Sequence, residues 1–253
     1  MKIRFLGTGT STGVPEIGCE CAVCISDDWR DKRLRCSVQI ETDDANIIID
    51  CTPDFRQQML QVPFQKIDAI LITHEHFDHV GGIEDLRPFC RFGTVETYAE
   101  PHVVQAIENR MPYVFNGRKY RGIPDIGIVP ITSLDPFRIK DTEIIPIRVM
   151  HHKLPILGFR IGGFAYLTDV KQLPEEELGK LSGLDLLVAS ALREEEHISH
   201  QTLAEAIALA EKINPKQTFF THMSHQIGLH RNIESQLPPG FSFAFDGLEI
   251  SLK

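Results

Sequence analysis

The chain has 253 residues, of which 42% are hydrophobic and 24% charged, and its formal net charge is −9. This length suits one large domain, and the composition is ordinary for a soluble globular protein. The acidic total argues against sequence-independent binding to RNA or DNA, which requires many basic residues against the phosphates.

The amino-terminal residues form a short apolar run without the basic and long apolar regions of a secretory signal. No apolar run approaches the roughly 18 residues of a membrane span. We therefore expect a cytoplasmic protein that does not bind membranes. Thiols stay reduced in that compartment, so clustered cysteines are expected to bind metal rather than form disulfides.

Short runs rich in Ile, Val, Phe and Leu, each bounded by turn residues, predict strands along much of the chain. They cover residues 2–6, 37–41, 47–50, 69–73, 97–99, 144–149, 158–161, 164–167, 184–189 and 218–221. Apolar residues at three- and four-residue spacing predict helices at 99–109, 175–181 and 201–212. This order of elements suggests an α/β domain over residues 1–253 in which helices cover two sheets.

Four of these strands lead into residues of the kinds that bind metals. His74 follows the strand at 69–73, His151 and His152 follow 144–149, Asp169 follows 164–167, and His222 follows 218–221. Apolar strands that deliver His or Asp at the same relative position imply one common edge where these side chains meet. We therefore expect a site at that edge.

The densest group of metal-binding residue types lies at positions 74–79. It contains His74, His76, Asp78 and His79. Imidazole and carboxylate together suit Zn, Mn, Fe or Ni better than Ca or Mg. Six residues do not easily wrap four ligands around one ion, so the run favours two ions about 3.5–4 Å apart.

Cysteines form a second candidate metal site near the amino terminus. Cys19, Cys21 and Cys24 lie within six residues, a spacing that favours a tetrahedral structural zinc with one further ligand. Cys36, Cys51 and Cys90 are scattered along the chain, and we interpret them as small apolar core residues.

The His-x-His-x-Asp-His run after an apolar strand resembles the signature of the metallo-β-lactamase superfamily. The resemblance implies an αββα sandwich, made of two mixed sheets covered by helices, with a two-metal site at one edge. It further implies that His74, His76 and His151 hold one ion, that Asp78, His79 and His222 hold the other, and that Asp169 bridges them. His152 is the rival of His151, and Asp50 resembles the buried aspartate that orients ligands in the family.

One branch of that superfamily matches further. Cys-x-Cys-x-x-Cys after Gly-Val-Pro, together with Thr-His-Met-Ser-His-Gln at 221–226, resembles the PhnP-type phosphoribosyl cyclic phosphodiesterases. This resemblance implies that His225 is the fourth zinc ligand and that His200 is a general acid, with His197 as its competitor. The expected cofactors are two divalent ions, Zn or Mn and alternatively Ni, plus one structural Zn.

The function implied is hydrolysis of a small cyclic or nucleotide-like phosphodiester by a metal-activated hydroxide, with His200 and Asp78 as catalytic residues. 5-Phosphoribosyl 1,2-cyclic phosphate is the specific substrate expected. An RNA-processing nuclease of the tRNA 3′-end type, a lactone or thiolester hydrolase, and a metal scaffold without turnover are the alternatives. A homodimer is usual among such relatives.

A basic stretch stands out in this acidic chain. Residues 110–121 contain Arg110, Arg118, Lys119 and Arg121 and no acidic residue. One hypothesis is an insertion at about 110–128 that grips the substrate through Arg118, Lys119 and Arg121, and a solvated insertion is equally consistent. His102 and His230 are predicted to lie on the surface.

Overall fold

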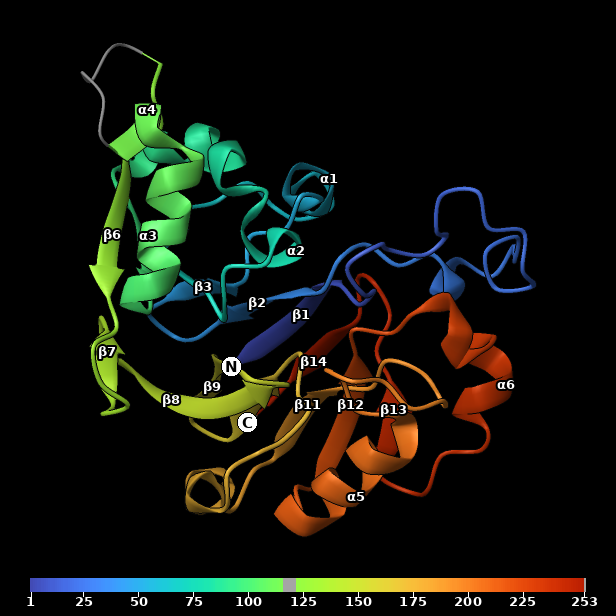
Figure 1. Ribbon diagram of the computed structural model, residues 1–253. Coiled ribbons are helices and arrows are strands. Elements are labelled where there is room, and N and C mark those ends of the chain that lie inside the picture. The colour runs from blue at the N-terminus through green and yellow to red at the C-terminus, as the bar shows by residue number, and fades with distance from the viewer. Residues whose placement is uncertain (116–121, 253) are drawn as a thin grey trace.

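The computed structural model describes residues 1–115 and 122–252 of the chain. In this described part the strands form two sheets of seven strands each. The sheets face each other and helices lie on their outer sides (Figure 1). The predicted αββα sandwich with two mixed sheets is therefore confirmed.

The first sheet begins with antiparallel strands and continues with parallel ones. Strands β14, β1, β2 and β3 pair antiparallel, and β3, β4, β5 and β6 pair parallel. Their bounds, in order across the sheet, are β14 Glu249–Ser251, β1 Lys2–Gly7, β2 Ser37–Glu41, β3 Asn46–Ile49, β4 Ala69–Leu71, β5 Val95–Ala99 and β6 Ile126–Pro130.

The second sheet has the same mixture. Strands β13, β12, β11 and β10 pair parallel, whereas β10, β9, β8 and β7 pair antiparallel. Their bounds, in order across the sheet, are β13 Phe241–Phe243, β12 Gln217–Thr221, β11 Leu186–Ser190, β10 Phe164–Leu167, β9 Leu154–Ile161, β8 Thr142–His151 and β7 Phe137–Ile139. Because two antiparallel steps separate them, β8 runs in the same direction as β10.

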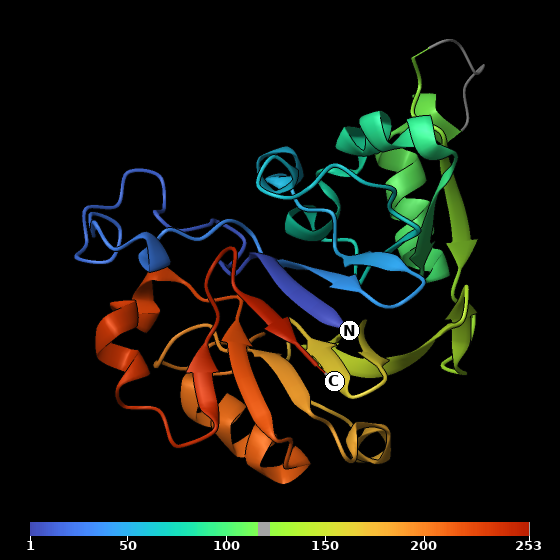
Figure 2. The same ribbon diagram turned by 180° about the vertical axis from the view of Figure 1, so that it is seen from behind.

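Helices cover both outer faces of the sandwich. The α-helices are α1 Phe55–Met59, α2 Phe77–Val80, α3 Pro101–Arg110, α4 Pro112–Phe115, α5 Leu203–Ile213 and α6 His230–Glu234. The 3-10 helices are η1 Trp29–Asp31, η2 Ile83–Phe92, η3 Glu175–Leu181 and η4 His225–Ile227. None of these described helices is both long and apolar enough to cross a membrane. Figure 2 shows the two chain ends side by side, where the Met1 amino group donates to the Leu252 carbonyl over 3.1 Å.

The core lies between the sheets. Phe5 and Ile47 of the first sheet and Phe159 and Tyr166 of the second belong to one cluster of fully buried side chains. Truncating such a residue, for example Phe159→Ala, would cost about 3–5 kcal/mol through lost burial and the cavity left behind. This packed core makes the sheet edges a rigid support for side chains that extend beyond the strands.

Several details differ from the sequence predictions. The segment 175–181 is a 3-10 helix, η3, because it is short and contains Gly179, and its buried Glu177 accepts the Arg148 backbone N–H. The helix predicted from residue 99 begins at Pro101, since residues 95–99 form β5. Part of the predicted 110–128 insertion is regular structure, namely α4 and the start of β6.

Candidate metal centre

The predicted ligands meet at one edge of the sandwich because the strands that carry them run in the same direction. Asp50 follows β3, Asp169 follows β10 and His222 follows β12. These three residues have left-handed backbones, with φ of 65°, 55° and 58°. Non-glycine residues adopt this conformation rarely and at a cost of about 1–3 kcal/mol each, which points to a functional constraint on the side chains.

The run at 74–79 leaves β4 and turns at once into the short helix α2. Gly82 follows this helix and passes very close to the chain after β3, since a Cβ at position 82 would lie 2.0 Å from the Thr52 carbonyl oxygen. Only glycine permits that approach. The turn therefore presses His79 and Val80 into the interior while His76 stays exposed.

The donor atoms form two groups that Asp169 connects. His74, His76 and His151 offer atoms within 4.8 Å of one another, and so do His79, Asp169, His222 and Cys36. Asp169 Oδ2 lies 3.2 Å from His79 Nε2, and the side chain of Asp169 also forms a group with His151 and His200. Asp78 Oδ2 lies 3.2 Å from His79 Nε2. The sequence-predicted residues are thus brought together around one carboxylate.

Two buried ring nitrogens support a metal site. Nε2 of His74 is buried without a hydrogen-bond partner among the described residues, although such atoms are normally satisfied. Nε2 of His79 is also buried and faces the Asp78 and Asp169 carboxylates, each 3.2 Å away. Burial lowers the pKa of His74 well below its usual value, so the ring is neutral. A neutral imidazole with a free nitrogen is the form that binds a divalent ion, so the donor set fits Zn, Mn or Ni.

Hydrogen bonds orient the ligand rings. Asp50 Oδ2 lies 2.7 Å from His79 Nδ1, and Asp50 Oδ1 accepts from the Thr73 backbone N–H over 2.9 Å. Burial opposes protonation of His79, but Asp78, Asp50 and Asp169 together raise its pKa well above normal. Asp50 therefore lies where the family resemblance implies, in contact with a predicted ligand.

His151 fits the metal group better than His152. Nδ1 of His151 lies 3.0 Å from the Asp169 carbonyl oxygen and 2.9 Å from that of Ser199, which leaves Nε2 for an ion. His151 is 7% exposed, whereas His152 is an exposed residue in a left-handed turn. The strand β8 also extends through His151 instead of ending at Val149 as predicted.

His200 is held beside these ligands by the start of α5. The centre of its ring lies 4.6 Å from the centre of the His151 ring and 5.0 Å from that of the His222 ring. Its Nδ1 is 3.6 Å from Asp169 Oδ1. The next residue, Gln201, donates its N–H to the Val170 carbonyl over 2.9 Å, and Thr202 begins α5 with a capping box. Burial lowers the pKa of His200 to about 3. His197 lies farther out, 5.0 Å from the His200 ring.

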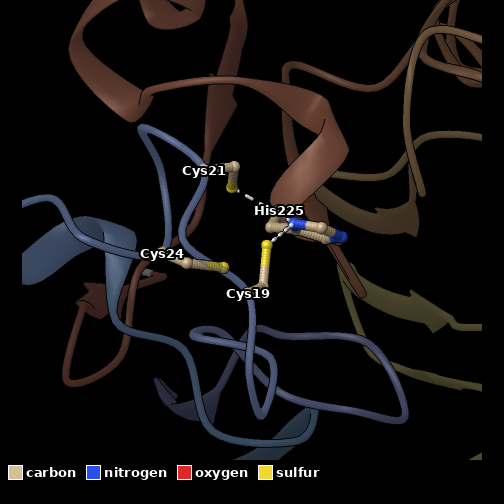
Figure 3. A group of neighbouring side chains, drawn as sticks. All are labelled: Cys19, Cys21, Cys24 and His225. Atoms are coloured by element: carbon tan, nitrogen blue, oxygen red, sulfur yellow. Dashed lines mark hydrogen bonds between the residues drawn. The ribbon is translucent and has the colours of Figure 1, made fainter.

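The cysteine loop gains its predicted fourth partner from the carboxyl-terminal half of the chain. Figure 3 shows Cys19, Cys21 and Cys24 around one ring nitrogen of His225. His225 Nδ1 lies 3.2 Å from Cys19 Sγ and 3.3 Å from Cys21 Sγ. Three thiols and an imidazole in this arrangement suit tetrahedral zinc.

Glu16 also contacts this second site, although it was not predicted from the sequence. Glu16 Oε2 lies 3.2 Å from His225 Nε2, and its backbone N–H donates to Cys24 Sγ. A carboxylate on the far nitrogen of a ligating histidine fixes the ring and increases its basicity. Its only sequence signal is proximity to the cysteines, because His225 lies 209 residues further along the chain.

Four other predictions have different outcomes. His230 is buried, not on the surface: its ring packs against Phe243 and Phe245, and buried Arg33 lies 3.1 Å from its Nδ1. His102 is exposed as predicted. Arg118, Lys119 and Arg121 lie outside the described residues. Cys36, interpreted as an apolar core residue, lies 3.1 Å from His222 Nδ1.

Comparisons with known proteins agree with this fold. Residues 45–223 match the model of the β-lactamase superfamily domain. The crystal structure of a new diphosphatase from the PhnP family is 38% identical, with a TM-score of 0.93, and the match covers 100% of this chain and 98% of that one.

Two curated relatives are longer proteins. An octanoyltransferase of Porphyromonas gingivalis is 45% identical over 251 residues, which are 98% of this chain and 51% of that protein. A ribonuclease Z of Methanococcus aeolicus is 26% identical over 199 residues, 76% of this chain and 54% of that protein. This chain therefore spans about half the length of these relatives. By its family match and its structural neighbour, the chain belongs to the metallo-β-lactamase superfamily of hydrolases, in the PhnP-type branch.

Proposed function

We propose that the protein hydrolyses a small phosphodiester with two divalent ions held around Asp169. The observation that carries this proposal is the pair of donor groups joined by that carboxylate, with His200 beside them. When bound, two such ions activate water for in-line attack and neutralise charge on the phosphoryl oxygens. In this proposal His74, His76 and His151 hold one ion and Asp78, His79 and His222 the other.

The proposed substrate has a phosphorus atom with two bridging oxygens and one negative charge. A cyclic phosphodiester such as 5-phosphoribosyl 1,2-cyclic phosphate meets this description. So does each phosphorus of a diphosphate substituted at both ends, the kind of bond to which the term diphosphatase of the PhnP-family neighbour applies. One site chemistry therefore serves both substrates, and we propose that the choice between them depends on contacts away from the ions.

His200 is the proposed general acid for the departing oxygen. Its Nδ1 lies 3.6 Å from Oδ1 of Asp169, whereas His79 is near Oδ2 of the same carboxylate, and it shares a group of donor atoms with His151 and Asp169. Burial disfavours its protonated form, whereas the negative charge of a bound phosphodiester favours it. Proton donation of this kind contributes about 10²–10⁴-fold to the rate.

Arg110 is the described residue of the basic stretch that lies beside this site. Its guanidinium carbon is 5.8 Å from the centre of the Phe77 ring, and Phe77 lies between His76 and Asp78 and is 58% exposed. An exposed aromatic ring with a cation over it offers a surface for a base or a distant phosphate. We propose that this pair contacts the substrate beyond the reacting phosphorus.

Acyl thioester hydrolysis is the second candidate, because a relative named octanoyltransferase is 45% identical. That name describes a protein about twice as long, so its activity can belong to the half that this chain does not match. Ribonuclease activity is less favoured, since this chain carries a net charge of −9 and a nuclease must bind many phosphates.

A substrate panel tests the proposal. The metal-loaded protein is assayed with bis-p-nitrophenyl phosphate, 5-phosphoribosyl 1,2-cyclic phosphate, a dinucleoside diphosphate, pre-tRNA, a lactone and an octanoyl thioester. We expect turnover of the first three and a loss of about 10²–10⁴-fold in kcat for His200→Ala with its metal content kept. The matched variant His197→Ala should keep most activity. Turnover confined to the thioester or lactone would overturn the proposal.

A further inference from the structure

Cys36 occupies an unusual place for a buried cysteine. It directly precedes β2, is 1% exposed, and its Sγ lies 3.1 Å from His222 Nδ1 and 3.4 Å from Thr168 Oγ1. Cys36 thus contacts a proposed ligand from the first sheet, whereas His222 follows β12 of the second sheet. Cys51 is equally buried but packs in an apolar cluster.

We propose that Cys36 is a positioning residue that fixes the imidazole of His222 for metal binding. In this role the sulfur accepts the N–H of His222 Nδ1, in competition with Asp169 Oδ2, which lies 3.3 Å from the same nitrogen, and Nε2 of the ring would hold the ion. The Thr168 hydroxyl instead donates to Asp169 Oδ2 over 2.7 Å and lies farther from His222. The imidazole of His222 stacks against those of His79 and His200, so its polar partners decide which nitrogen is free for an ion. Outer partners of ligating histidines typically change metal affinity about 10–100-fold.

This role and a merely apolar role predict opposite responses to substitution. Cys36→Val keeps an apolar side chain of similar size but has no acceptor for the imidazole N–H. Cys36→Ser keeps an acceptor and places a hydroxyl in the interior. If Cys36 is only an apolar core residue, the valine variant should bind metal normally and the serine variant should bind it more weakly. If Cys36 positions His222, the valine variant should bind metal more weakly and the serine variant should bind it normally.

The experiment measures metal per chain and metal affinity, by competition with a chromophoric chelator, for the wild type, Cys36→Ser, Cys36→Val and the control Cys51→Val. We expect Cys36→Val to lose about 10–100-fold affinity for one ion and the other variants to retain it. Cobalt-loaded wild type and Cys36→Ser should share the same near-ultraviolet sulfur-to-cobalt absorption, because the cysteine loop contributes equally to both.

Two results would overturn the inference. Unchanged affinity in Cys36→Val would show that the thiol does not position the ligand. A sulfur-to-cobalt band that disappears in Cys36→Ser would make Cys36 a direct ligand instead. The inference rests on the proposed metal centre but on no particular substrate. If the wild type binds no ion beyond one per chain at the cysteine loop, the metal centre fails with it; if it binds more and Cys36→Val binds them equally, only the Cys36 assignment fails.

Discussion

Asp50→Asn separates metal binding from folding. The Asp50 carboxylate is fully buried, and it contacts His79 Nδ1 at 2.7 Å and the Thr73 N–H and hydroxyl at 2.9 and 3.0 Å. An amide has the same shape, but its NH₂ group must face one of these donors. Loss of one charge-assisted hydrogen bond is worth about 1.5–3 kcal/mol, and each 1.4 kcal/mol is about tenfold in affinity. We therefore expect affinity for the ion at His79 to fall about 10–100-fold.

The same substitution should change the stability of the metal-free protein less than it changes metal affinity, because the lost hydrogen bond to His79 or Thr73 and the removal of a buried charge act in opposite directions. Burial raises the pKa of Asp50, which means that the ionised carboxylate is disfavoured in the folded interior, and asparagine removes that charge. Chelator competition gives the affinity, and urea unfolding after metal removal gives the stability. Asp68→Asn is the matched control, since Asp68 pairs with Lys66 and Lys140 away from the site. Unchanged metal affinity together with a less stable metal-free protein would refute this reasoning.

Three further changes have distinct readouts. Arg110→Ala should raise KM for a dinucleoside diphosphate several-fold and leave kcat for bis-p-nitrophenyl phosphate unchanged; equal KM values in steady-state assays would argue against a substrate contact. His230 has a folded pKa lowered by burial to about 4 from 6.5, so the unfolded chain binds the additional proton and stability is lost as pH falls from 6.5 to 4, by on the order of 2 kcal/mol. Urea unfolding of metal-saturated His230→Asn should show a flatter dependence over that range, and an identical slope would contradict it. Cys21→Ser should lose one zinc per chain by elemental analysis and lower the melting temperature while the other ions remain bound; an unchanged zinc count would exclude the cysteine loop as a metal site.

Local patterns of apolar residues were sufficient to predict the central strands of the two sheets. The apolar runs at 37–41 and 164–167 coincide with β2 and β10, because strands buried on both faces are nearly continuous in apolar residues. The strands at the sheet edges, β6, β7, β13 and β14, were not predicted. The last three have three residues each, which is too short for a periodic pattern. Strand β6 contains Gly127 and ends at Pro130, two residue types that weaken a strand pattern.

The site was predictable where its residues lie close together in sequence or end a strand. The run at 74–79 and the positions of Asp169 and His222 provided that signal. Contacts between distant segments gave none: Cys36 meets His222 186 residues later, and His230 meets Arg33 197 residues earlier. A cysteine or histidine in a polar sequence context indicates nothing about such a partner. Cys36 is buried as predicted but its polar contact was not foreseen, whereas the surface prediction for His230 was wrong.

The most direct test of the account is a metal titration followed by activity. Protein that retains only its cysteine-loop zinc is titrated with Mn or Zn while hydrolysis of bis-p-nitrophenyl phosphate is measured. The two donor groups around Asp169 predict that activity rises to a plateau at two added ions per chain, and that Asp169→Ala abolishes both the plateau and the activity. Phosphodiester hydrolysis that persists without added metal, or that is indifferent to Asp169, would contradict the proposed two-metal site.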